Sequence, residues 1–333
     1  MSLLDTPFTR QVGIEVPLIC GAMYPCSNPE LVAAVSAAGG IGIVQPLSMV
    51  YVHGHELRAG LRLIRELTDR PIGFNALIEK TTRVYERRMH AWIEVAIEEG
   101  VRLFVTALGN PRWVVELVHA AGGVVYHDVT ERRWADKALE AGVDGLICVN
   151  ARAGGHAGTR APDELYAELA DLGVPLICAG GIGDEHAFAA ALRLGYAGAQ
   201  LGTRFIATEE CRVHPDYHRA ILDAGEEDIV LTDKFSGVPC AVIRTPTVER
   251  IGTRAGPLAR WMLRGRRTKR LMRMIYALRS LRELKHSSLK GVSYRDVFQA
   301  GKSVAGIRAV EPAGEVVRRF AAAAAEAGAA SPG

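Results

Sequence analysis

The sequence of 333 residues lacks the features of several specialised protein classes. It contains no run of about 18 apolar residues and no charged start followed by an apolar stretch, so neither a membrane helix nor a signal peptide is expected. Its six cysteines form no CxxC pair and no zinc-type spacing. The formal net charge of +3 does not by itself indicate a polyanionic partner. These absences predict a cytoplasmic protein with no metal centre and no binding to membrane or nucleic acid.

Aromatic residues are also scarce, at 6%, whereas glycine is abundant, with 35 residues. The glycines have no three-residue period, which excludes collagen, and the hydrophobic fraction of 49% is too high for a disordered chain. The protein is therefore globular, and the abundance of glycine requires an explanation.

Short apolar runs alternate with helical patterns over the first two thirds of the chain. Each run is rich in Val, Ile or Leu and is bounded by Gly, Pro or a polar residue, as in fully buried parallel strands. Successive runs begin about 26 residues apart, which is typical of a (β/α)8 TIM barrel, with a doubly wound open sheet as the alternative. The runs are Pro17–Gly21, Ile41–Val44, Ile72–Asn75, Leu103–Thr106, Val124–His127, Gly145–Val149, Val174–Ala179 and Ala199–Gly202.

The helical patterns between the runs often end on glycine. Glycine after a helix end adopts the left-handed conformation without a steric penalty, so this placement accounts for part of the glycine excess. The patterns include Pro29–Ala38, Glu56–Leu67, Trp113–Ala121, Arg132–Ala141 and Glu185–Leu194.

The pattern changes after about residue 225. We expect a barrel over 1–225, a lid or substrate segment over 226–294, and a C-terminal helix within 295–333, near Pro312–Ala327, that packs back on the barrel. Between Arg260 and Lys290 lie eleven Lys or Arg and one acid, a formal charge of +10 that leaves −7 for the rest of the chain. An apolar stripe predicts a helical lid or cap here, with three open interpretations: a solvated basic face, a rim that attracts anionic substrates or acyl carriers, or a surface for nucleic acid or membrane.

Three glycine clusters lie at the carboxyl ends of predicted strands rather than at helix ends. They are Gly21 after the first strand, residues 154–158 after the sixth, and Gly180, Gly181 and Gly202 after the seventh and eighth. The carboxyl ends carry the active sites of TIM barrels, and the loops after strands 7 and 8 bind phosphate through backbone N–H groups. The clusters therefore predict a site for phosphate or a phosphorylated cofactor.

Several segments resemble one known family. The segments "ARAGGHAG" (151–158), "CAGGIGD" (178–184) and "AQLGTRFIATEE" (199–210) are similar to the signature segments of the FMN-dependent nitronate monooxygenase, or 2-nitropropane dioxygenase-like, family. "AAVSAAGGIGIV" (33–44) and "DRPIGFNALI" (69–78) fit its N-terminal part, and "SGVPC" (236–240) continues the likeness more loosely. The resemblance extends from about Pro17 to Pro215.

The resemblance implies FMN as the cofactor and a role for individual residues. It implies that Ala22 and Met23 lie beside the flavin ring, that Asn75 reaches the polar edge of the ring, and that His156 faces the substrate. The residues implied to hold the ribityl phosphate are Gly154, Gly180, Gly181, Gln200, Gly202 and Thr203.

Three positions depart from the family pattern. Members often have Gln seven residues and Glu four residues before the histidine, where this chain has Val149 and Arg152. Asp128 stands where some relatives have a basic residue. These departures leave the substrate open but not the flavin.

His156 is also a candidate catalytic residue on chemical grounds. A histidine titrates near neutral pH, and small neighbours, Gly155 and Ala157, leave its ring little steric cover. It can act as a base toward a proton next to a nitro group or donate a hydrogen bond to a nitronate anion; a histidine that only bonds its own loop is the alternative. His127, at the end of the fifth strand, is predicted to be a second polar group of the active site.

The predicted function is the oxidation of nitronates or nitroalkanes, with a small-molecule substrate, O2 as electron acceptor, no metal, and a homodimer as a possible assembly. Two alternatives share the fold and the flavin: an NAD(P)H:quinone reductase-like enzyme and a flavin-type enoyl-thioester reductase. An alternative of another class is a non-catalytic binding protein that uses the basic segment.

Overall fold

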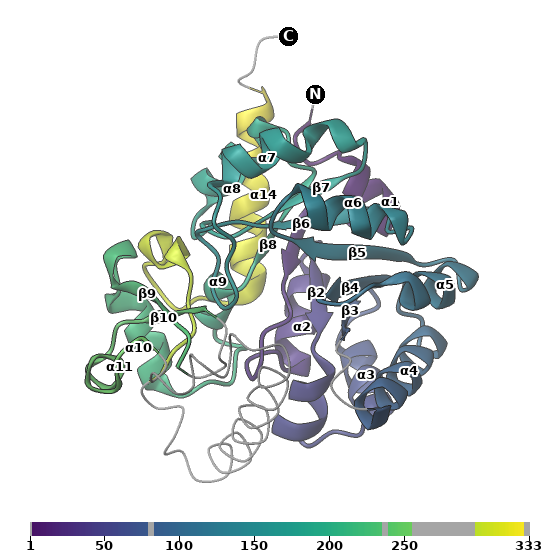
Figure 1. Cartoon of the computed structure of the whole chain (residues 1–333), viewed down its shortest axis with the longest axis horizontal. Coiled ribbons are helices and arrows are strands. Elements are labelled where there is room, and N and C mark those ends of the chain that lie inside the picture. The colour runs from purple at the N-terminus through teal and green to yellow at the C-terminus, as the bar shows by residue number, and fades with distance from the viewer. Residues whose placement is uncertain (1, 79–82, 235–238, 255–296, 330–333) are drawn as a thin grey trace.

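The computed structural model describes residues 2–78, 83–234, 239–254 and 297–329. Eight parallel strands form a closed barrel in chain order (Figure 1). The barrel closes where β1 pairs with β8, at Leu18 opposite Ala199. The (β/α)8 prediction is therefore confirmed, and the open-sheet alternative is wrong. The strands are β1 Leu18–Cys20, β2 Ile41–Val44, β3 Gly73–Leu77, β4 Leu103–Ala107, β5 Val124–Val129, β6 Gly145–Val149, β7 Leu176–Ala179 and β8 Gly198–Leu201.

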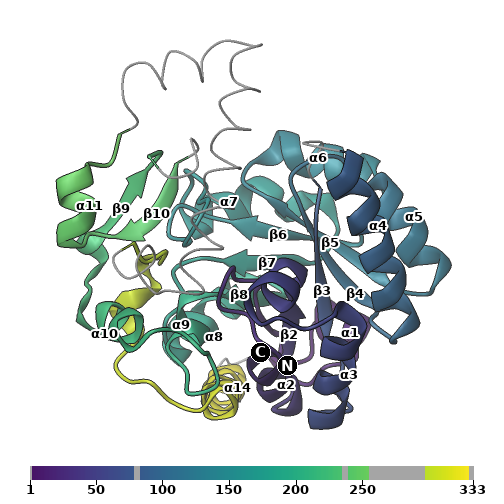
Figure 2. The ribbon, with the colours of Figure 1, turned by 90° about the horizontal axis from the view of Figure 1, so that it is seen from below.

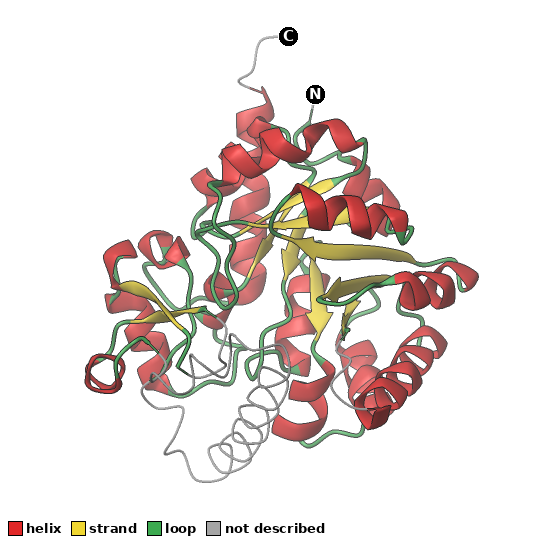
Figure 3. Ribbon diagram, viewed as in Figure 1, coloured by secondary structure: helices red, strands yellow, loops and turns green. Residues whose placement is uncertain are grey.

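Helices surround the barrel and cover the outer face of the strands (Figure 3). The five predicted helices begin and end within one residue of the observed bounds. Gly39, Gly122, Gly142 and Gly195 have positive φ, from 70° to 116°, as expected for glycine at helix ends. The surrounding helices are α2 Pro29–Ala37, α3 Leu57–Leu67, α4 Arg83–Glu98, α5 Arg112–Ala120, α6 Arg132–Glu140, α7 Pro162–Leu169 and α8 Glu185–Leu194, with a π-helix η1 Ser48–Val52 and a 3-10 turn η2 Ala170–Leu172.

Residues inside the barrel form one hydrophobic cluster. It contains Ile19, Val105, Tyr126 and Ile147. A short helix, α1 Pro7–Val12, closes the barrel at the end where the strands begin. Phe8 of α1 meets the ring of Tyr126 edge-on, with 5.3 Å between centroids. The amino end of the barrel is thus filled with side chains, which leaves the carboxyl end for a ligand.

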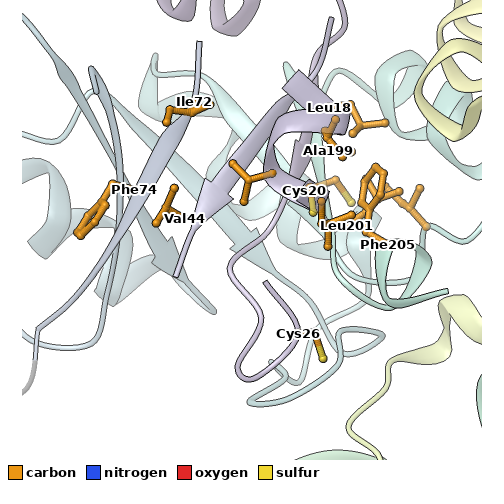
Figure 4. Close-up of a cluster of buried hydrophobic side chains, with 14 of the residues drawn as sticks. Leu18, Cys20, Cys26, Val44, Ile72, Phe74, Ala199, Leu201 and Phe205 are labelled. Atoms are coloured by element: carbon orange, nitrogen blue, oxygen red, sulfur yellow. The ribbon is translucent and has the colours of Figure 1, made fainter. Parts of the chain in front are cut away.

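A second cluster fills the space between strands and helices. It takes the alternate residues of the same strands, such as Leu18 and Cys20 on either side of Ile19, together with Val44 and Phe74 (Figure 4). Successive residues of a strand point to opposite faces, so membership of one cluster or the other shows which way each strand residue faces.

The chain after β8 builds a lobe beside the barrel (Figure 2). Two antiparallel strands in this lobe pair with each other, and Ala241 N–H donates to Gly155 O of the loop after β6 at 2.7 Å. The lobe contains α9 Thr203–Ile206, α10 Pro215–Asp223, η3 Glu226–Asp228, β9 Ile229–Thr232, β10 Cys240–Ile243, α11 Pro246–Ile251 and η4 Lys302–Gly306.

The chain ends in the long helix α14, Ala313–Ala329. This helix lies against α8 and α2, with the rings of Phe188 and Phe320 5.5 Å apart (Figure 1). It matches the helix predicted near Pro312–Ala327. The basic helix predicted between 260 and 290 lies outside the described residues. No helix within the described ranges has both the length and the apolar character that crossing a bilayer requires.

Candidate active site

Polar side chains face the barrel interior at the carboxyl ends of three strands. Gln200 on β8 is in register with Ile19 of β1, a member of the interior cluster. Asn75 on β3 is in register with Val105, also an interior residue. Neighbouring residues in register point to the same face of a sheet, so Gln200 and Asn75 face the barrel axis. The structure thus brings two of the predicted site residues to the mouth of the barrel.

Gln200 has a buried polar atom that requires a partner. Its side chain packs beside Gly21, where an added Cβ would lie 3.0 Å from Gln200 Cγ. Gln200 Oε1 is buried and accepts no hydrogen bond from any described residue. Buried polar atoms are nearly always hydrogen-bonded, so this orphaned oxygen fits a ligand with donor groups at the mouth. Asn75 is less free, because its Nδ2 donates a 3.3 Å bond to Val105 O.

Two positions of the loop after β7 require glycine. Gly180 and Gly181 have φ of 119° and 82°, in the region that disfavours other residues. A Cβ at Gly180 would lie 2.5 Å from Ala153 N and 2.6 Å from Asn150 Oδ1. The loops after β6 and β7 are therefore packed backbone to backbone.

Asn150 joins these two loops and was not identified from the sequence. It is fully buried directly after β6, its Nδ2 donates to Gly180 O at 3.0 Å, and its Oδ1 accepts from Arg152 N–H at 2.8 Å. The sequence feature that could have identified Asn150 is a polar amide directly after an apolar strand. Asn150 fixes the position of the glycine pair.

The β8–β1 corner of the mouth is more open. A Cβ at Gly202 would meet only Met23, with Sδ at 3.5 Å. Gly202 caps α9, and the first N–H groups of a helix have no carbonyl partner within it. Met23 is held by Ser27, which exchanges hydrogen bonds of 2.9 Å with its backbone, and Ala22 lies beside the interior cluster. Met23 and Gly202 are thus adjacent, as a shared site requires.

The β6–β7 corner is covered by chain that returns from the lobe. A Cβ at Gly154 would lie 2.9 Å from Gly301 N, and one at Gly183 would lie 2.0 Å from Ser303 O. Gly301 N–H also donates to Thr203 Oγ1 at 3.0 Å, so the Thr203 hydroxyl binds protein. Packing against residues 300–303 accounts for glycine at position 154, and its contact with a cofactor stays a prediction.

His156 lies exposed in the loop after β6. The preceding residue, Gly155, is bridged to Ala241, so the lobe positions the histidine loop. Arg152 approaches the glycine pair, because a Cβ at Gly181 would lie 2.5 Å from its Nε, and its guanidinium pairs with Glu226 of η3. Arg152, which stands where the family pattern has Glu, therefore places a positive charge beside Gly180 and Gly181, two of the residues predicted to bind phosphate.

Two neighbouring residues of β5 face opposite sides of the barrel wall. His127 is in register with Leu146 of the outer cluster, and its Nδ1 lies 2.8 Å from Thr106 Oγ1. Burial lowers the pKa of His127 to about 4. The prediction that His127 belongs to the active site is wrong, because strand alternation turns it away from the mouth. Asp128 is in register with Ile147 of the interior cluster, and burial raises its pKa to about 7.

Comparison with known proteins identifies the family. The sequence model of the nitronate monooxygenase family matches residues 5–318. The chain belongs to the nitronate monooxygenase family. A nitronate monooxygenase of Pseudomonas aeruginosa strain PAO1 is 29% identical over 69% of this chain and 77% of its own length. The protein is therefore an oxidoreductase on a TIM barrel, from a family of flavin enzymes.

This chain is also similar to proteins that are not named nitronate monooxygenases. A (3aS,4S,5R,7aS)-5-hydroxy-7a-methyl-1-oxo-octahydro-1H-indene-4-carboxyl-CoA dehydrogenase of Mycobacterium tuberculosis H37Rv is 32% identical over 82% of this chain and 76% of its own length. The solved structure of FabK from Thermotoga maritima has a TM-score of 0.78 and 28% identity, covering 97% of this chain and 96% of FabK. A nitroalkane oxidase from Streptomyces ansochromogenes, with a TM-score of 0.73 and 24% identity over 97% of this chain and 99% of its own, shares the fold.

Proposed function

We propose that this protein is an FMN-dependent oxidoreductase that oxidises nitronates or nitroalkanes with O2. The observation that carries the proposal is the orphaned Oε1 of Gln200, which faces the barrel axis between Gly21 and the open corner at Gly202. A buried acceptor at the mouth of a TIM barrel, next to glycine loops after strands 7 and 8, fits a flat, polar-edged and phosphorylated ligand.

The described residues divide into those that would hold the phosphate and those that would hold the ring. Backbone N–H groups of Gly180, Gly181, Gly202 and Thr203 would bind the phosphate, with Arg152 beside them. Gln200 and Asn75 face the axis, so they suit the polar edges of the ring better than the phosphate, and Ala22 and Met23 would line one side of it. Bound FMN supplies the two-electron redox chemistry, while the protein supplies position and electrostatics.

His156 would meet the substrate at the rim of the mouth. Its imidazole can donate a hydrogen bond to the nitro or nitronate oxygens, which stabilises the negative charge that these oxygens carry. We expect His156→Ala to keep FMN and to lower turnover of neutral nitroalkanes by roughly tenfold or more. Oxygen uptake measures this turnover. A rate equal to that of the wild type would contradict a catalytic role of His156.

A second candidate function is redox chemistry on an acyl thioester. The relative from M. tuberculosis is named for a CoA thioester, and its identity of 32% exceeds the 29% of the P. aeruginosa nitronate monooxygenase. This chain has Val149 and Arg152 where the family pattern has Gln and Glu. These replacements are consistent with a thioester substrate instead of a nitronate.

The deciding experiment is anaerobic reduction of the purified enzyme, followed by the flavin absorbance. We expect the enzyme to be yellow and to be bleached by propionate-3-nitronate or a nitroalkane. Bleaching by NADH or NADPH with no response to nitronates would overturn the nitronate assignment, and bleaching by a CoA thioester alone would favour the second candidate. A colourless protein that binds no FMN would contradict both.

We further infer a cytoplasmic location for the enzyme. The supporting observation is that all six cysteines are free, buried thiols. Unpaired thiols are typical of a reducing compartment.

A further inference from the structure

Arg152 carries a positive charge at a position where the family pattern has an acid. Members often have Glu there, four residues before the histidine, so this chain reverses the charge. Among the residues that the structure describes, its guanidinium pairs with a single acid, Glu226 of η3, and the two side chains are 35% and 37% exposed. An ion pair with this exposure adds little to stability, so the pair alone does not account for an arginine here.

The backbone of Arg152 is held on both sides. Its N–H donates to the buried amide of Asn150, 2.8 Å from Oδ1, and its carbonyl accepts from Lys302 N–H at 2.9 Å. A Cβ at Gly301 would lie 2.7 Å from the same carbonyl. The loop after β6 and the chain that returns from the lobe therefore determine the direction in which the Arg152 side chain leaves the backbone.

The Arg152 side chain lies across Gly181 of the loop after β7. A Cβ at Gly181 would lie 3.0 Å from Arg152 Cβ, 2.9 Å from Cδ and 2.5 Å from Nε. Glycine at this position therefore leaves the space that the arginine stem occupies, and the guanidinium begins beside the loop. Gly180 and Gly181 carry two of the backbone N–H groups proposed for phosphate, so the structure places a cation next to them.

The guanidinium has donors to spare for a second anion. Arginine presents five N–H donors in a rigid, planar fork, and the bond from Nη2 to Glu226 Oε1 uses one of them. Among the described residues, Nε, the atom beside Gly181, has no acceptor. Charge-assisted bonds from this fork to phosphate are strong and geometrically specific. An anion at the glycine loop can therefore bind Arg152 while the contact with Glu226 persists.

We propose that Arg152 binds the phosphate of FMN and is the residue that makes this enzyme select FMN over riboflavin. The inference rests on the proposed function, because it requires FMN as the cofactor. Gly180 and Gly181 offer neutral backbone donors, and Arg152 adds the positive charge that complements a phosphate dianion. Arg152 thereby supplies an electrostatic contact at the loop after β6, where the Glu of the family pattern would repel an anion.

A substrate carboxylate is the other anion that a cation at the mouth could bind. Propionate-3-nitronate carries a carboxylate, whereas ethylnitronate does not. Arg152 lies against Gly181, in the loop proposed for phosphate, while His156 of the exposed rim is the residue proposed to meet the substrate. This placement favours the phosphate. Flavin titrations contain no substrate, so they report on the cofactor alone.

The test is fluorescence titration of the full-length apoprotein with FMN and with riboflavin, in the wild type, Arg152→Gln and Arg152→Lys. We expect Arg152→Gln to weaken FMN binding by about 20-fold and riboflavin binding by less than about twofold, because riboflavin lacks the phosphate. Arg152→Lys restores part of the FMN affinity, since it keeps the charge without the planar fork. The preference for FMN falls with added salt in the wild type and depends less on salt in Arg152→Gln.

Glu226→Gln is the matched control, because it removes the ion pair but leaves Arg152 and its charge in place. The amide oxygen of the new side chain can still accept from the guanidinium, so FMN affinity should stay within about threefold of the wild type. Equal losses of FMN affinity in Arg152→Gln and Glu226→Gln would show that the contact with the lobe accounts for the loss, and would overturn the role of Arg152 toward phosphate.

Three further results separate this inference from the proposed function. Unchanged FMN affinity in Arg152→Gln, or a parallel loss of both flavins, overturns the role of Arg152 while the proposed function stands. Unchanged flavin affinities together with a raised KM for propionate-3-nitronate, but not for ethylnitronate, assign Arg152 to the substrate carboxylate instead. A wild-type apoprotein that binds neither flavin overturns the proposed function and this inference with it.

Discussion

The two corners of the barrel mouth use glycine for different purposes. At the β6–β7 corner, Gly154 and Gly183 lie so close to residues 300–303 that a side chain would collide with backbone. At the β8–β1 corner, a side chain on Gly202 would meet only the Met23 sulfur, at an ordinary 3.5 Å. A glycine motif at a barrel mouth therefore indicates a ligand only where the chain itself does not fill the space.

Gly183→Ala gives the largest expected effect and tests the covered corner. The new methyl group would overlap Ser303 O, 2.0 Å away, so we expect a loss of about 3 kcal/mol in the free energy of unfolding. Chemical denaturation measures it. Gly122→Ala is the matched control, since Gly122 has φ of 70° but no atom within 4 Å, and it should cost only about 1 kcal/mol. Equal losses in the two variants would show that backbone conformation, rather than packing, accounts for the effect.

Gly202→Ala tests the open corner. Its φ of −110° suits alanine and no backbone is near, so the free energy of unfolding should stay close to the wild type. The methyl group would instead occupy space next to the proposed phosphate, and we expect about tenfold weaker FMN binding, or about 1.4 kcal/mol. Fluorescence titration of the apoprotein gives the dissociation constant. Unchanged FMN affinity would mean that the open corner does not hold the cofactor.

Thr203→Val separates the two roles of a residue that touches both corners. The hydroxyl accepts the bond from Gly301 N–H, whereas the Thr203 backbone N–H is the group proposed for phosphate. We expect a loss of about 1 kcal/mol in stability with little change in FMN affinity. Thr203→Ser, which keeps the hydroxyl, should restore stability. A larger effect on FMN than on stability would place the hydroxyl in the cofactor site.

Burial of a basic and an acidic residue side by side on β5 gives opposite pH dependences. The His127 pKa falls from 6.5 to about 4 on folding, so its contribution is present above pH 6.5 and is lost as the pH falls toward 4. The Asp128 pKa rises from 3.8 to about 7, so its contribution is present below pH 3.8 and is lost as the pH rises through 7.

Unfolding measured between pH 4 and 8 should therefore show opposite slopes in two variants. Relative to the wild type, His127→Gln gains stability toward pH 4 and Asp128→Asn gains stability toward pH 8. For Asp128→Asn we expect a gain on the order of a few kcal/mol toward pH 8, because each unit of pKa shift corresponds to about 1.4 kcal/mol. Slopes of the same sign in the two variants would contradict the opposite pKa shifts of the two residues.

The barrel could be predicted from the sequence because its strands are buried on both faces. Each strand is then a continuous apolar run, and a glycine after the helix gives its boundary. The same property hid the direction of His127 and Asp128, because "VVYHDV" (124–129) shows no alternation of polar and apolar residues. Direction followed only from the register of β5 with β6.

The covered corner could not be predicted because its contacts join distant parts of the chain. Gly183 contacts residues about 120 positions later, and no local pattern reports such packing. The sequence assigned Gly154 and Gly202 the same predicted role, contact with the phosphate, and only the packing around each residue distinguishes them. Asn150 was missed because a lone amide after a strand has many ordinary explanations.

The central claim, that the mouth of this barrel binds a phosphorylated flavin, is tested most directly by comparing FMN with riboflavin. The measurement is fluorescence titration of the wild-type apoprotein with each ligand at the same pH and ionic strength. We predict that FMN binds at least about 100-fold more tightly than riboflavin, because only FMN carries the charged group for the glycine loops. Equal affinities for the two flavins, or binding of neither, would contradict the account.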